Sequence, residues 1–378
     1  MSDFKGGGRP SVRDVDGDGE AELEDDALDF QGGGAKAVGG INNDIRVPPG
    51  AGESGLRDAL NDASAGQTVH LPAQFSETIT NGTLTIPSGV KLLGPSVTQG
   101  GPVTLTKGFD GTLLEYDSNT VIAGLYIDGN RANHTGNGVA PVENAPREVV
   151  MRNVFIEECE TAAFRLQSTY FSRFWNCYGL RSGYALRVAG DTDAVTNTFY
   201  SCRFGRSEVG VSIEQTHARS VYFNCRIDRN SGAGMALDSG TSSVSFALSG
   251  TAIDNNDGPG VLIDGTFNSV GLQTDMSTRI TENAQNPDSG LTTPVGSIHS
   301  ENGARIQGRL GHVFDDPLIR HNSDGLNGFV TILGGSASVE PDVTLPDTSL
   351  IILNDRTVGS VTALNGSGIS PSNGVVSY

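Results

Sequence analysis

The chain has 378 residues, of which 51 are glycine, and its 44 acidic residues outnumber 25 Lys plus Arg, giving a net charge of −19. The glycines follow no Gly-X-Y period and no stretch of 18 apolar residues occurs, which excludes a collagen and argues against membrane insertion. The acidic excess repels phosphate and argues against nucleic-acid binding, and the scarcity of lysine indicates a halophilic protein, with an ordinary acidic extracellular protein as the alternative.

Residues 1–44 form a Gly- and Asp-rich segment with almost no apolar periodicity. We expect an attachment arm that other subunits hold in place, and no Sec-type signal peptide, because the first residues contain no apolar core. Within the arm, Asp-Val-Asp-Gly-Asp-Gly is similar to the calcium loop of EF-hands and dockerins. The residues at the ligand positions are Asp14, Asp16, Asp18, Glu20 and Asp25. Calcium is therefore a possible ligand, although no cofactor is required, and a solvated acidic arm is the alternative.

Residues 44–127 have the pattern expected at the entry to a solenoid. Four apolar residues repeat at helical spacing, with Ser54 as the expected N-cap and Gly66 as the stop: Leu56, Ala59, Leu60 and Ala63. Short strand-like segments follow. An amphipathic helix at this place would cover the open end of a stack of strands.

From residue 151 onward, a pair of short strand patterns recurs at a period of about 24 residues. Its marker is an Asn or Ser at spacings of 23, 25, 23 and 25, found at Asn153, Asn176, Ser201, Asn224 and Ser249. Apolar residues alternate within each segment, and no helical pattern separates the segments. Such a repeat predicts an all-β fold, a parallel β-helix over residues 45–300, whose coils bury one another.

The repeat also predicts which side chains share a column. We expect the Asn/Ser markers to stack, and Cys177, Cys202 and Cys225 to lie buried beside them as free thiols. Strand alternation places Trp175, Tyr200, Phe223 and Leu248 in the core. The same alternation turns Phe174, Phe199 and Tyr222 outward, as a subunit interface or a platform for sugar rings. Burial beneath a loop or beneath the C-terminal module is the alternative for these three rings.

Residues 301–378 lose the 24-residue period and read as irregular strands separated by Pro and Gly turns. We expect them to form a C-terminal β module or cap.

Three segments carry a family resemblance: LRDALNDASAGQTVHLP, LTIPSGVKLLGP and VIAGLYIDGNRANHTGNGV. They resemble the pectin-lyase-like superfamily of right-handed parallel β-helices, over about residues 45–290. The resemblance implies the fold rather than one function, because that superfamily includes lyases, hydrolases, epimerases and non-enzymatic viral spikes and fibres.

Polysaccharide-cleaving members of this superfamily use paired carboxylates on adjacent coils as acid and base. By this resemblance, the catalytic candidates are Asp128, Asp228 and Asp254, each of which directly follows an inward Ile. The alternative is structural, since Asp at the end of such a strand commonly forms an Asx-turn.

The loop that contains Arg131 and His134 is a second candidate site, for a uronate or a sulfate. Lyases of the superfamily typically pair an Arg or Lys base with carboxylate-bound calcium. No adjacent acidic trio that would hold such a metal is evident in the sequence, and a solvated surface loop is the alternative.

The leading hypothesis is an adhesive or structural virion component of a haloarchaeal virus: a capsid turret or decoration, or a tail spike or fibre. It would assemble in the host cytoplasm and act outside the cell, which requires no export signal. Its partners would be further copies of the chain (a trimer, or a five-fold turret), other virion proteins through residues 1–44, and a cell-surface glycan or glycoprotein. The alternative is an extracellular polysaccharide lyase, hydrolase or epimerase, and a spike that also depolymerises glycan combines the two.

Overall fold

The structure, a computed structural model, describes residues 44–95, 103–142, 146–190, 194–214, 217–237, 243–264, 269–274, 278–281 and 283, together with eight later strands. Residues 43–378 form one compact unit. The predicted arm up to residue 43, with its calcium-loop residues, lies outside the described residues.

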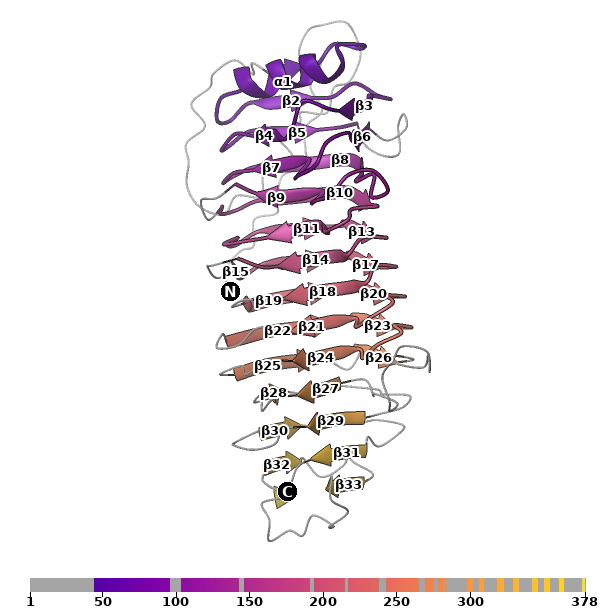
Figure 1. The fold of residues 1–378 in the computed structure, drawn as a ribbon. Helices are drawn as coiled ribbons and strands as arrows, with labels where there is room; N and C mark the ends of the chain where they lie inside the picture. The colour runs from indigo at the N-terminus through magenta and orange to yellow at the C-terminus, as the bar shows by residue number, and fades with distance from the viewer. Residues whose placement is uncertain are drawn as a thin grey trace, which may run out of the picture. The chain divides into compact units, whose positions relative to one another are not determined.

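The described strands form an all-β, right-handed parallel β-helix, as the repeat predicts (Figure 1). One sheet consists of β4 Leu84–Ile86, β7 Leu114–Tyr116, β9 Val139–Pro141, β11 Ala162–Leu166, β14 Tyr184–Val188, β18 Val209–Ile213, β21 Met235–Leu237, β24 Val261–Asp264, β27 Ile298–Glu301, β29 Leu318–Asn322, β31 Asp342–Leu345 and β33 Ser360–Ala363. Neighbours in this sheet pair in parallel, and so do those of the second sheet.

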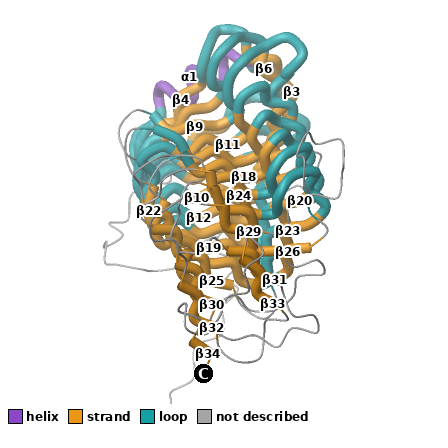
Figure 2. Tube along the Cα trace, turned by 60° about the horizontal axis from the view of Figure 1, so that its bottom comes forward, coloured by secondary structure: helices purple, strands orange, loops and turns teal. Residues whose placement is uncertain are grey.

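The second sheet is larger and bends at a corner between successive short strands of each coil. It consists of β1 Ile45–Arg46, β2 Thr68–His70, β3 Ser76–Ile79, β5 Lys91–Leu93, β6 Val103–Lys107, β8 Val121–Asp128, β10 Val150–Glu157, β12 Arg173–Trp175, β13 Tyr178–Leu180, β15 Ala194–Val195, β16 Thr198–Tyr200, β17 Arg203–Gly205, β19 His217–Phe223, β20 Arg226–Asp228, β22 Ser243–Ser249, β23 Ala252–Asp254, β25 Ser269–Thr274, β26 Arg279–Thr281, β28 Ile306–Gly308, β30 Phe329–Ile332, β32 Leu350–Leu353 and β34 Val376–Ser377. Figure 2 shows the strands of successive coils lying side by side. Parallel pairing between neighbouring coils continues to β34.

The helix α1, Gly52–Asp62, lies beside β3 and β4 at the first end of the stack. Its apolar residues Leu56, Ala59 and Leu60 are buried, as is Ala63 directly after it, which confirms the amphipathic pattern. The predicted N-cap is wrong, because the helix begins after Ala51 and Ser54 lies inside its first turn. Glu53 instead anchors this end: its carboxylate accepts hydrogen bonds from the backbone of Thr80 at 2.8 Å and of Asn81 at 3.0 Å.

The coils between residues 119 and 256 turn at residues with left-handed backbone conformation, and the residue that follows each of these points into the core. The first corner has Asn119, Glu148, Phe171, Thr196 and Arg219; the second has Gly124, Asn153, Asn176, Ser201, Asn224 and Gly250; the third has Glu158, Arg181, Arg206, Arg229 and Asn255. A left-handed residue interrupts the strand alternation, so the side chains before and after it do not keep a two-residue period.

The second corner confirms most of the predicted Asn/Ser column. Asn176 Nδ2 donates to Asn153 Oδ1 at 2.7 Å, and Ser201 and Asn224 occupy the same place in the next coils. The position predicted for Ser249 is wrong, because Ser249 pairs with Phe223 and the corner residue is Gly250. The coil that ends there has one more residue, which the marker spacing did not reveal. Cys177, Cys202 and Cys225 are buried free thiols, as predicted.

A longer polar ladder that the sequence analysis missed runs along the third corner, inside the core. The side-chain oxygen of each member accepts a hydrogen bond, at 3.0–3.3 Å, from the backbone N–H of the preceding coil's member. The accepting residues are Ser182, Ser207, Asn230, Asn256 and Asn283. These bonds satisfy backbone groups that the turns remove from the sheets. Among the described residues, no helix is long and apolar enough to span a membrane.

Candidate functional site

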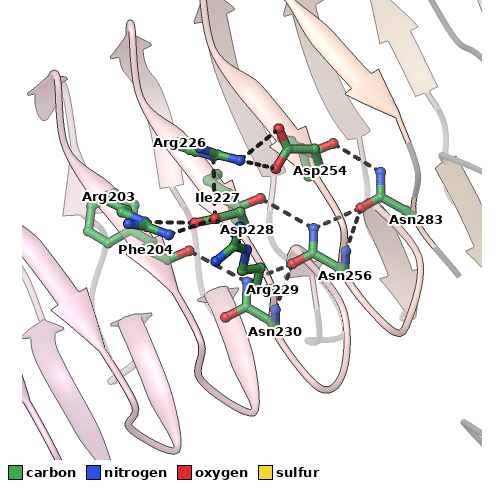
Figure 3. Close-up of polar contacts among 11 residues, drawn as sticks. Arg203, Phe204, Arg226, Ile227, Asp228, Arg229, Asn230, Asp254, Asn256 and Asn283 are labelled. Atoms are coloured by element: carbon green, nitrogen blue, oxygen red, sulfur yellow. Dashed lines mark hydrogen bonds and ion pairs between the residues drawn. The ribbon is translucent and has the colours of Figure 1, made fainter. Parts of the chain in front are cut away.

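Asp228, at the end of β20, is the most deeply buried of the three acidic candidates, and it is neutralised by arginines. Its side chain is completely buried. Arg203 on the preceding coil binds both carboxylate oxygens at 2.8 Å, and Nε of Arg226 and of Arg229 lie 3.3 and 3.7 Å from Oδ2 (Figure 3). A buried carboxylate requires such partners, since leaving it unpaired would be strongly unfavourable.

A missing side chain makes this arrangement possible. Gly205 is the in-register neighbour of Asp228 on the preceding coil. A Cβ atom there would lie 2.4 Å from the Asp228 carbonyl oxygen and 2.7 Å from its Oδ1. The glycine therefore leaves the space through which Asp228 reaches Arg203.

Asp254 lies directly below Asp228 in the register, as the sequence predicts for a pair on neighbouring coils. Arg226 stands between the two, with Nη2 at 3.2 Å from Asp254 Oδ1 (Figure 3). The two carboxylates thus share a guanidinium, and neither is an unengaged acid or base.

Asp128, at the end of β8, has the structural role that was its alternative interpretation. Its Oδ1 accepts a hydrogen bond from the backbone N–H of Asn130 at 2.8 Å, which is the contact of an Asx-turn. Among the described residues, no group of three His, Cys, Asp or Glu side chains is placed to hold a metal ion.

Arg131 and His134 lie in the loop after β8, and both already have acidic partners. Arg131 forms an ion pair with Glu208, three coils further along the stack. His134 Nδ1 lies 3.7 Å from Asp110 Oδ1. The loop is fastened from inside by Lys107, whose buried Nζ donates to the Thr135 carbonyl at 2.9 Å. In the structure, Arg131 and His134 therefore hold this loop against the rest of the chain.

The prediction that Phe174, Phe199 and Tyr222 point outward is wrong. Their side chains are at most 1% exposed, and the rings stack in the core at centroid distances of 4.8 and 4.6 Å. The reason is the left-handed residue, such as Asn176, that follows each outer ring and interrupts the two-residue alternation of the strand. Phe174 and Cys177 therefore both point inward, although an unbroken strand would turn residues three positions apart to opposite faces. Leu248 is buried as predicted, but it pairs with Tyr222 and belongs to this inner column.

The outward rings are Trp175, Tyr200 and Phe223, which were assigned to the core. They are partly exposed and stacked face to face at 5.4 and 5.2 Å, and the Arg152 guanidinium covers Trp175 at 4.8 Å. The faces of Trp175 and Tyr200 are covered by Arg152 and by the neighbouring rings, so a sugar cannot stack on them. This column stabilises the stack of coils rather than forming a sugar platform.

The most distinctive outward feature lies on the next face, between the second and third corners. Three consecutive coils carry five arginines there, at Arg181, Arg203, Arg206, Arg226 and Arg229; we call these residues the arginine face. The sequence signal for it was an Arg followed by Ser or Asn at 181–182, 206–207 and 229–230. Only the structure shows that these pairs occupy the same corner.

No protein-family model and no curated protein matches this sequence. Solved structures do resemble it. The catalytic unit of a thermostable α-1,3-glucanase from Streptomyces thermodiastaticus is 15% identical with a TM-score of 0.60, covering 91% of this chain and 67% of that one.

Two other solved structures resemble the fold to a similar degree. The Dettilon tailspike protein is 11% identical with a TM-score of 0.56, covering 82% of this chain and 64% of its own. The A-module of an Azotobacter vinelandii mannuronan C-5 epimerase is 17% identical with a TM-score of 0.51, covering 89% of this chain and 99% of its own. At these identities the likeness shows the β-helix fold alone.

Proposed function

We propose that this protein is a virion attachment component, a spike, fibre or turret, whose β-helix binds a host-surface glycan or receptor without cleaving it. The observation that carries the proposal is the state of Asp228, one of the two acidic candidates on adjacent coils, which is buried and has three arginines within 3.7 Å. A general acid or base must reach the substrate and exchange a proton with it. Asp228 meets neither requirement in this arrangement.

The virion setting is supported by the sequence and by the comparisons. The acidic, lysine-poor composition and the Gly- and Asp-rich first 44 residues suit an attachment arm on a particle exposed to salt. One of the similar β-helices is a tailspike protein. Under this proposal residues 1–44 join the β-helix to other virion subunits. Deleting them should leave the β-helix folded but reduce the oligomeric mass in sedimentation.

The alternative is a polysaccharide-acting enzyme, which is favoured by the register that brings Asp228 and Asp254 to adjacent coils. Two of the similar structures are a glucanase and an epimerase module. This alternative requires ligand binding to break the ion pairs of Arg226 with both carboxylates.

Binding and cleavage can be separated in one experiment. The full chain is incubated with whole cells and with a panel of purified surface polysaccharides, and bound protein, new reducing ends and absorbance of unsaturated uronates are measured. We expect retention on at least one glycan with no new reducing end and no unsaturated product. Release of oligosaccharide that the Asp228→Asn and Asp254→Asn variants abolish would establish the enzymatic alternative instead.

A further inference from the structure

The corner arginines of three consecutive coils occupy a backbone conformation that arginine does not favour. Arg181, Arg206 and Arg229 have φ values of 52°, 55° and 58°, in the left-handed region. This conformation is unfavourable for residues other than glycine, and Asn and Asp are the alternatives that tolerate it best. The next coil has Asn255 at the same corner. Because the backbone conformation favours other residues, we attribute the repetition of arginine at this corner to a role of its side chain.

The charge of this region is opposite to that of the chain. The segments 178–182, 203–207 and 226–230 contain five arginines and a single acid, Asp228, for a local charge of +4 in a protein of net charge −19. Acidic residues bound the region on both sides along the stack, with Glu157 and Glu158 on the preceding coil and Asp254 on the following one. The arginine face is thus a basic strip three coils long.

The corner guanidinium groups are only weakly engaged. Arg181 is 48% exposed and lies 3.4 Å from Glu157, and Arg229 is 55% exposed and lies 3.7 Å from Asp228. The pair of Arg181 with Glu157 is partly exposed, and such pairs contribute little. Arg229 is the most distant of the three arginines around the buried Asp228. Arg206 is exposed, and its side chain forms no ion pair among the described residues.

We propose that the arginine face binds the carboxylate or sulfate groups of a linear acidic glycan that runs along the axis of the stack. This inference rests on the proposed attachment function and specifies its ligand class and its surface. In-register side chains of successive coils repeat about every 4.8 Å, so the three corner arginines offer a row of planar donors that match carboxylate and sulfate oxygens in pairs. A DNA duplex fits this strip poorly, because it carries a negative charge about every 1.7 Å along its axis and many of these charges would face the acidic surroundings.

The test uses substitutions that suit the corner geometry. Arg206→Asn and the triple variant Arg181→Asn/Arg206→Asn/Arg229→Asn place at each corner the residue already present at Asn255, so the fold should be retained. Arg219→Asn is the matched control, since Arg219 is exposed and left-handed (φ 57°) but lies at the first corner. Thermal melting and circular dichroism verify the fold of each variant.

Binding of the full chain is measured by calorimetry with dextran sulfate, polygalacturonate and uncharged dextran at several salt concentrations. We expect binding to at least one of the two polyanions, no binding to dextran, and an affinity that falls with salt. The single variant should weaken binding about threefold and the triple variant about 30-fold, with Arg219→Asn unchanged. Preference for dextran sulfate or for polygalacturonate distinguishes sulfate from carboxylate as the ligand group.

Three results would overturn the inference: equal binding of the triple variant, an equal loss in Arg219→Asn, or equal affinity for single-stranded DNA of matched charge. If whole cells or a neutral polysaccharide still retain the triple variant as well as the parent chain, the attachment function stands and only the arginine face is excluded. If the parent chain binds neither cells nor any of the glycans, the attachment function itself is rejected.

Discussion

His217 is a titratable residue enclosed in the core of the stack. Its side chain is fully buried, with Nε2 at 3.3 Å from the Tyr222 hydroxyl and Nδ1 at 3.5 Å from Ser220 Oγ. Burial lowers the pKa of His217 from 6.5 to about 4. The imidazole is therefore neutral in the folded protein at pH values where the unfolded chain is already protonated.

The first prediction concerns the stability that this residue controls. Because its folded pKa is the lower one, the unfolded chain binds more protons between pH 6.5 and about 4, and the free energy of unfolding falls as the pH falls through that range. His217 costs no stability well above pH 6.5, where it is neutral in both states, and its protonation in the unfolded chain lowers the free energy of unfolding by about 3 kcal/mol at pH 4.

Chemical denaturation of the parent chain and of His217→Gln at pH 4, 5, 6 and 7 measures this contribution. Carboxylates titrate equally in both proteins, so the difference between the two pH profiles isolates the histidine. The variant should show the shallower loss of stability, and parallel profiles would contradict the prediction.

The corner ladders are the elements that link one coil to the next outside the β-sheet bonds. Asn256 has the most contacts of its kind: Oδ1 accepts from Asn230 Nδ2 at 2.7 Å, and Nδ2 donates to Asn283 Oδ1 at 2.7 Å and to the Ile227 carbonyl at 3.2 Å (Figure 3). Asn176, in the column recognised from the sequence, is only partly buried and has the single amide bond to Asn153. The inner ladder should therefore matter more for stability.

The second prediction compares these two elements. Asn256→Leu keeps the shape of the side chain but leaves buried donors and acceptors of Asn230, Asn283 and Ile227 without their partner, at a cost of about 3 kcal/mol. Asn176→Gly removes one partly exposed bond and suits the left-handed backbone, so it should cost less than about 1 kcal/mol. Urea denaturation of both variants tests the order, and a larger loss in Asn176→Gly would contradict it.

The aromatic columns also link each coil to the next, through side chains of the strands rather than of the corners. Phe174, Phe199 and Tyr222 stack along the inside while Trp175, Tyr200 and Phe223 stack along the outside, each ring on the equivalent ring of the next coil. The inner stack is a core that every coil from β12 to β19 shares. The outer stack extends the same register to the surface.

For the molecule as a whole, charge is the dominant long-range effect. A net charge of −19 opposes any compact state, and dissolved salt reduces this repulsion. The third prediction is that the melting temperature rises by roughly 5 °C or more between 0.1 and 2 M sodium chloride. Sucrose at matched osmolality is the control, because it stabilises by exclusion from the surface without screening charge. A melting temperature that is flat or falls with salt would argue against the halophilic interpretation.

The repeat in the sequence was sufficient to predict the parallel β-helix, its capping helix and the buried cysteines. Each of these follows from a local pattern: apolar residues at a constant period of about 24, or at helical spacing in residues 56–63. Such patterns report which residues avoid water, and burial follows from that preference whatever the detailed register.

Tertiary structure decided which face each ring occupies and what the acidic residues do. Strand alternation was extended across Asn176, whose left-handed backbone resets it, so Phe174 and Trp175 exchanged their predicted places. The coil before Gly250 has one residue more than the spacing suggested, so the corner position expected at Ser249 is occupied by Gly250. For Asp228 the sequence left a catalytic role and an Asx-turn open and did not reveal its partner Arg203, which precedes it by 25 residues. Only the stacking of coils brings the two side chains to 2.8 Å. Which residues of two coils meet depends on the length of each coil and on where its left-handed corners fall. Both are settled when the coils stack, and no single segment of sequence determines them.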